Sequence, residues 1–282
     1  MSGVSGSNRI NRKDFVSVLN IYRKEVLEKI PGFISVSVSG SFESNQSKAD
    51  FGDMDLIVQF RSNDNKKDLK KSLVKHFGSL SDDVIIPFSS DKYRGRKSYN
   101  SGEIVTVSFP QPEGTVQIDN IIALSPEEVE YKKRFLDLPA PKQGLLAGVV
   151  RTSLFEKGYS YFGLLRPSDA ELEFVISSKQ LQLREVSLEM KSGSLVESSR
   201  KILSTTMNWD KVELITPDYD WDLSFEDLVE QVRKNITNIR SLSRIVGLFK
   251  SQVTVKSGEI GTPKAKEKEE SVKLMETLLI NK

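Results

Sequence analysis

The chain has 282 residues, of which 38% are hydrophobic and 28% charged, and this composition is typical of a chain with a folded core. Its 41 basic and 39 acidic residues leave a net charge of only +2, which excludes nucleic-acid binding through bulk positive charge. With no cysteine and one histidine, disulfides, zinc–thiolate sites and multi-histidine metal sites are excluded. The sequence shows neither a membrane span nor a secretory signal, so we expect a cytoplasmic protein without membrane contacts.

The first part of the chain alternates predicted helices and strands. After a flexible leader at residues 1–10, apolar residues at helical spacing predict helices over 11–30 and 65–78. Alternation of apolar and small polar residues predicts strands at 33–39, 54–60, 84–88, 104–109 and 116–123. This order predicts an α/β (α+β) domain over residues 11–125, built on a mixed sheet flanked by helices.

The second part, residues 126–256, is predicted to be a mainly helical domain. The predicted helices begin at Ser125-Pro126, cover 142–156, and run for about seven turns from Ser224 to Lys250. Residues 171–176 and 180–186 fit either a hairpin or helical segments. Small residues and mixed charge predict a linker over 257–270, and a short terminal helix follows within residues 257–282.

Three aspartates stand out against this background. Asp53 and Asp55 alternate with apolar residues on one predicted strand, so their side chains point to the same face, roughly 6–7 Å apart. Two such carboxylates repel each other and are costly to desolvate unless a hard cation such as magnesium neutralises them. Asp119 lies on a later strand between apolar neighbours. The ordinary alternative is an edge strand with solvated acids.

The pair Gly40-Ser41 follows directly after the predicted strand 33–39. A glycine at a strand end lets the backbone approach a phosphate group, and the Ser41 hydroxyl and nearby N–H groups can bind phosphate oxygens. Three carboxylates on two strands can in turn hold two metal ions for displacement at a phosphorus atom. A strand-end turn without function is the alternative for Gly40-Ser41 taken alone.

Taken together, Gly40-Ser41, eleven intervening residues, Asp53-Met54-Asp55 and a distant strand aspartate resemble the signature of the polymerase-β-like nucleotidyltransferase superfamily. The resemblance covers residues 10–125 and is strongest to the poly(A)-polymerase, CCA-adding and oligonucleotide-synthase-type branches. It implies that Asp53 and Asp55 bind two Mg²⁺ (or Mn²⁺) ions and that Asp119 positions the catalytic ion and helps to activate the acceptor hydroxyl. It also implies that Gly40 and Ser41 grip a nucleoside triphosphate such as ATP.

The reaction implied by this resemblance moves a nucleoside monophosphate from the triphosphate to an acceptor hydroxyl and releases pyrophosphate. An RNA 3′ end, a nucleotide and a small molecule all remain open as acceptors. The chain departs from several branches at Glu43, Lys48 and Asp50, where those branches are rich in glycine and threonine. The alternatives are a catalytically inactive nucleotidyltransferase-like binding or scaffold module, and another metal-dependent phosphotransferase or nuclease, which Gly40-Ser41 disfavours.

One short segment, here called the basic loop, concentrates positive charge around Tyr93. Its basic residues are Lys92, Arg94, Arg96 and Lys97. Such a loop can contact a triphosphate or an RNA backbone, with the tyrosine stacking on bases. A solvated hairpin tip is the alternative explanation.

Overall fold

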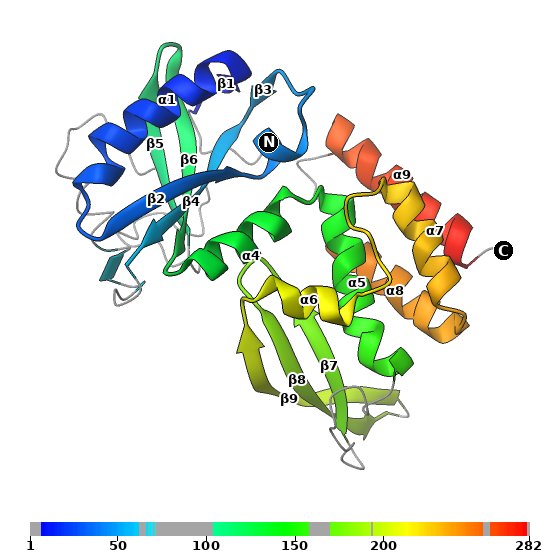
Figure 1. Cartoon of the computed structure of the whole chain (residues 1–282). Helices are drawn as coiled ribbons and strands as arrows, with labels where there is room; N and C mark the ends of the chain where they lie inside the picture. The colour runs from blue at the N-terminus through cyan, green and yellow to red at the C-terminus, as the bar shows by residue number, and fades with distance from the viewer. Residues whose placement is uncertain are drawn as a thin grey trace. The chain divides into compact units, whose positions relative to one another are not determined.

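The computed structural model divides the chain into two compact units, Met1–Asp137 and Leu138–Lys282, which are described separately (Figure 1). The described residues are 7–61, 66, 68, 69, 71, 104–157, 170–192, 194–255 and 260–280. Helix α4, Pro126–Asp137, belongs to the first unit, whereas the sequence predicts that the second part begins at residue 126.

The first unit is built on a mixed four-stranded sheet with helices packed on it, as predicted (Figure 1). In chain order its elements are β1 (Ile10–Asn11), α1 (Arg12–Glu25), η1 (Leu27–Lys29), β2 (Phe33–Ser39), α2 (Ser41–Ser44), β3 (Asp50–Phe51), β4 (Asp53–Phe60), β5 (Ile104–Gln111), β6 (Gly114–Ala123) and α4. The strand order is β2-β4-β6-β5, in which β4 and β6 run parallel and the other neighbours run antiparallel. The short strands β1 and β3 form a separate antiparallel pair.

The two faces of this sheet carry different residues because side chains alternate along each strand. On one face, Met54 and Leu56 of β4 are fully buried in a core that includes Phe15 and Tyr22 of α1. On the other face, Ile57 is buried against apolar residues of β6 and α4. Each such side chain contributes about 1.5–3 kcal/mol when fully buried. Helices therefore cover both faces of the sheet.

Three features of the first unit differ from the sequence predictions. Ile10 is fully buried and opens β1, so the flexible leader does not extend to residue 10. Helix α1 ends at Glu25 rather than near residue 30, because Ile30 precedes a proline and is extended, and η1 fills the interval. The predicted helix 65–78 lies mostly, and the predicted strand 84–88 entirely, outside the described residues.

The second unit combines helices with a three-stranded antiparallel sheet in the order β7-β8-β9 (Figure 1). Its elements are α5 (Ala140–Lys157), β7 (Ala170–Ile176), β8 (Leu181–Lys191), β9 (Ser194–Thr206), α6 (Trp209–Ile215), α7 (Phe225–Asn235), α8 (Ile239–Gln252) and α9 (Pro263–Leu279). The helical second part and the hairpin alternative are confirmed. Strand β9 was not predicted, because its many exposed serines and charged residues hide the alternation typical of a strand.

Two predictions for the second unit are wrong. The long helix predicted over 224–250 is broken, because Ile236 is extended and the Asn238 side chain caps α8 by accepting a hydrogen bond from the Arg240 N–H group. The predicted linker is helical from Pro263, since the hydroxyl of Thr262 caps α9 at Ala265. Both capping residues are visible in the sequence, but helical spacing and mixed charge are the stronger patterns at these positions.

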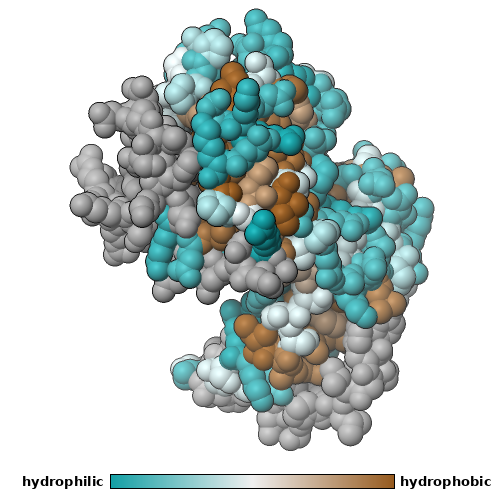
Figure 2. Space-filling model, turned by 60° about the vertical axis from the view of Figure 1, so that its left-hand side comes forward, coloured by the Kyte–Doolittle hydropathy of each residue, from teal (hydrophilic) through white to brown (hydrophobic). Residues whose placement is uncertain are grey.

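The surface of the described chain is largely hydrophilic on the side shown in Figure 2, where hydrophobic side chains gather in separate groups. The exposed large apolar residues are Val16, Ile21, Ile34, Ile202, Leu203, Leu214, Ile239 and Ile260. Singly exposed apolar side chains are common on folded domains, so no docking surface follows from them. Across the described ranges, no helix has the length and apolar character needed to cross a membrane.

Candidate active site

A row of polar residues crosses the four-stranded sheet from edge to edge. The strand register aligns Ser39 of β2 with Asp55 of β4, Asp55 with Asp119 of β6, and Asp119 with Thr106 of β5. Directly aligned residues on neighbouring strands share a face, so these four side chains stand on the same side of the sheet. Asp53 lies two residues before Asp55 and therefore shares this face as well. The structure thus brings the three predicted aspartates onto one sheet face.

The next row on the same face is apolar and marks the limit of the site. Ile57 aligns with Ile121, and both are buried in a small cluster that Val129 and Leu136 of α4 also join. The aspartates begin one row beyond this cluster, where all three are only partly buried. Helix α4 therefore seals one end of the sheet face, and the carboxylates occupy the other end.

The carboxylates interact with one another strongly enough to change their protonation. The pKa of Asp55 is raised to about 7, mainly because the side chain is removed from water and further because Asp53 and Asp119 are negatively charged, while Lys48 opposes the shift. Burial also raises the pKa of Asp119. Without a counter-ion, the group is therefore a cluster of mutually repelling acids.

Asp119 is held in place by neutral donors on its own sheet. The Thr106 hydroxyl donates a hydrogen bond of 2.6 Å to Oδ1, and the Gln117 amide lies 3.0 Å from both carboxylate oxygens. These bonds lower the pKa of Asp119 and partly offset the effect of burial. They also fix the orientation of the carboxylate, a role for Thr106 and Gln117 that no sequence motif indicates.

Gly40 meets two steric conditions that only glycine satisfies. Its backbone has φ +72° and ψ −145°, a conformation that residues with a side chain rarely adopt. A Cβ atom at this position would lie 2.3 Å from Oδ2 of Asp55. The strand end therefore runs directly against one of the carboxylates, which brings the predicted phosphate-binding turn and the acid cluster together.

Two basic residues hold the turn that follows Gly40. Arg12, the first residue of α1, donates hydrogen bonds from Nη2 to the carbonyl oxygens of Phe42 and Asn45, at 3.0 and 2.7 Å. Its guanidinium also lies 4.5 Å from the centre of the Phe42 ring. Lys48 donates a hydrogen bond of 3.1 Å to the hydroxyl of Ser41. Lys48 thus places a positive charge between Ser41 and Asp55, although in the sequence it stands out only as a departure from the family pattern.

The donor set suits a hard divalent cation in part. Among the residues that the structure describes, no three acidic or histidine side chains form a group ready to hold a metal ion. Magnesium sites in nucleotide enzymes, however, commonly use one or two carboxylates together with phosphate oxygens and water. Asp53 and Asp55 offer such a pair. Beside Asp55, the buried hydroxyl of Ser39 has no hydrogen-bond partner within the described part of the chain, which leaves one further oxygen at the site.

The basic loop plays no part in this geometry. Lys92, Arg94, Arg96 and Lys97 all lie outside the described residues, so their assignment stays a prediction. Comparison with known proteins adds no further information on the site. No protein-family model matches the chain, and no similar protein was found among the curated sequences.

Proposed function

We propose that the first unit is the catalytic domain of a metal-dependent nucleotidyltransferase. It would transfer a nucleoside monophosphate from a nucleoside triphosphate to an acceptor hydroxyl, with release of pyrophosphate. The observation that carries the proposal is the meeting of the Gly40-Ser41 turn with the carboxylates of Asp53, Asp55 and Asp119 on one sheet face. Repulsion among these acids is costly in the free protein, and binding of a cation relieves it.

Each side chain has a distinct part in this proposal. Asp53 and Asp55 would hold Mg²⁺ or Mn²⁺, which when bound offsets the charge of the phosphates and lowers the pKa of a bound hydroxyl. Ser41 and Lys48 would bind phosphate oxygens, since their side-chain atoms already lie 3.1 Å apart at the turn. Asp119, oriented by Thr106 and Gln117, would accept a hydrogen bond from the acceptor hydroxyl and draw its proton away.

The deciding experiment measures pyrophosphate release from each of the four radiolabelled nucleoside triphosphates with magnesium or manganese. Reactions with RNA, with a second nucleotide and without added acceptor distinguish the three acceptor classes by the size of the labelled product. Asp53→Asn and Asp55→Asn should abolish release, whereas Asp68→Asn, at a side chain that is 69% exposed, serves as the matched control. Triphosphate binding without turnover under all conditions would instead support the inactive binding module. Turnover that survives both site substitutions would refute the assignment.

A further inference from the structure

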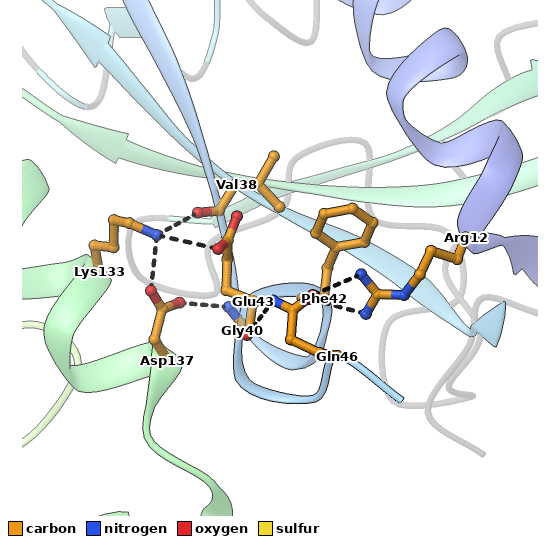
Figure 3. Close-up of polar contacts among 8 residues, drawn as sticks. All are labelled: Arg12, Val38, Gly40, Phe42, Glu43, Gln46, Lys133 and Asp137. Carbon is orange, nitrogen blue, oxygen red and sulfur yellow. Dashed lines mark hydrogen bonds and ion pairs between the residues drawn. The ribbon is translucent and has the colours of Figure 1, made fainter. Parts of the chain in front are cut away.

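Two residues of α4 hold the backbone on both sides of Gly40. Asp137 accepts a hydrogen bond of 2.9 Å from the Gly40 N–H group through Oδ1 (Figure 3). Through Oδ2 it pairs with Lys133 at 2.8 Å, and Lys133 also donates to the carbonyl oxygen of Val38 at 3.1 Å. Glu43, one turn further along, lies 4.0 Å from the Lys133 ammonium group. We name Lys133 and Asp137 the α4 clasp.

The clasp acts at the point where the pairing of two strands stops. The Gly40 N–H group lies beyond the paired residues of β2 and β4, whose register ends at Ser39 and Asp55, so the Asp137 carboxylate replaces a missing strand partner. A hydrogen bond to a carboxylate is roughly twice as strong as one between neutral groups. Asp137 and Lys133 also lie one helical turn apart, so a single face of α4 presents both groups.

Arg12 binds the same turn from the opposite side. Figure 3 shows Lys133 and Asp137 reaching the turn from α4, while Arg12 reaches it from α1. Arg12 fixes the carbonyl oxygens that follow Gly40, and the clasp fixes the N–H and carbonyl groups around Gly40 itself. The strained backbone of Gly40 is thus held by long-range contacts, because 97 residues separate it from Asp137.

We infer that Asp137, neutralised by Lys133, is a positioning residue that keeps the Gly40-Ser41 turn in the conformation that binds the triphosphate. This inference rests on the function proposed above and adds a residue outside the motif that suggested it. Neither clasp residue needs to touch the nucleotide. Loss of the clasp lowers the fraction of molecules whose turn is correctly formed, and the apparent dissociation constant rises by the same factor.

The test compares Asp137→Ala, Asp137→Asn and Glu130→Ala in the full-length chain. Glu130 forms an exposed pair with Arg134 on the same helix, so its substitution controls for the loss of one i,i+4 pair. Two quantities are measured: hydrogen exchange at the Gly40 amide without nucleotide, and the dissociation constant of the magnesium complex of a non-hydrolysable triphosphate. The base is the one that the wild type binds most tightly.

For Asp137→Ala we expect faster exchange at Gly40 and about tenfold weaker triphosphate binding, or about 1.4 kcal/mol. The kcat at saturating triphosphate should change less than about twofold, because the reacting groups are intact. Asp137→Asn keeps an acceptor for the Gly40 N–H group and should restore binding to within about threefold. Glu130→Ala should match the wild type. Should Asp137→Ala fail to fold, Lys133→Met gives the same readouts with Asp137 in place.

Three results would overturn the inference. The first is wild-type exchange at Gly40 in Asp137→Ala, and the second is wild-type affinity in that variant. The third is failure of Asp137→Asn to restore binding, since a merely structural role does not depend on the acceptor atom. If the wild type itself binds no triphosphate, the proposed function fails and the inference fails with it. If the wild type binds and Asp137→Ala binds equally well, only the inference fails.

Discussion

Replacing Asp55 with asparagine should stabilise the metal-free protein at neutral pH while removing its activity. Asparagine has nearly the same shape as aspartic acid but no charge. The substitution therefore removes the repulsion from Asp53 and Asp119 and the cost of burying an ionised group, the two causes that raise the pKa of Asp55. A catalytic substitution that increases stability is typical of an active site that is strained in the absence of its ligands.

The size and sign of the effect follow from the pKa of Asp55, which is about 7 in the folded chain against an ordinary value of 3.8. The folded state therefore binds a proton more tightly than the unfolded state, and its free energy of unfolding falls as the pH rises between these two values. The full loss corresponds to about 4 kcal/mol. Because Asp55 is partly exposed to water, we expect Asp55→Asn to gain about 2–4 kcal/mol near pH 8 and almost nothing near pH 4.

Urea unfolding followed by circular dichroism and by hydrogen exchange in β4 and β6 measures this difference in the presence of a chelator. Both tryptophans, Trp209 and Trp221, belong to the second unit, so their fluorescence reports that unit separately and should not change. Asp68→Asn is again the control. Magnesium with a triphosphate should stabilise the wild type more than the variant. Equal stability of the two proteins at every pH would refute the repulsion on which the argument depends.

Three further predictions concern other parts of the site. Asp119→Asn should retain triphosphate binding but lose most of its turnover, and a near-normal kcat would show that the acceptor is activated elsewhere. Gly40→Ala should cost about 1–3 kcal/mol in unfolding free energy and abolish triphosphate binding, whereas Gly247→Ala in α8, with no heavy atom within 4 Å of the added carbon, should stabilise by about 0.5–1 kcal/mol. If RNA is the acceptor and the basic loop binds it, neutralising the loop's four basic residues should reduce the log–log salt dependence of RNA binding by about 0.7–0.9 for each phosphate that the loop no longer neutralises; an unchanged slope with intact binding would exclude the loop.

The sheet of the first unit was predictable because its strands have alternating patterns. Strand β2 begins and ends at the predicted residues, β5 begins at its predicted residue, and β4 begins one residue earlier, at Asp53. That alternation was also sufficient to place Asp53 and Asp55 on one face. The alignment of Asp119 with Asp55 was not predictable, because strand order and register depend on packing rather than on local sequence.

The supports of the site escaped prediction for a different reason. Lys133 and Asp137 follow the i,i+4 spacing of an ordinary helix-surface pair, and Arg12 is an ordinary charge in the first turn of a helix. Only their partners in the fold distinguish them, and those partners lie 30 or more residues away along the chain. Charged side chains that bind distant backbone groups leave no periodic signal in a sequence.

The last turn of α4 links the stability of the sheet face to the geometry of the candidate active site. Leu136 packs on the apolar row of Ile57 and Ile121, and the next residue, Asp137, binds the Gly40 N–H group. Burial of Leu136 fixes the end of the helix, and the end of the helix fixes the carboxylate that supports the glycine turn. A shift of this turn by one residue would bring an apolar side chain to Gly40 and a carboxylate to the apolar cluster, where its burial without a partner is costly. The packing that seals one end of the sheet face therefore also sets the position of the turn at its other end.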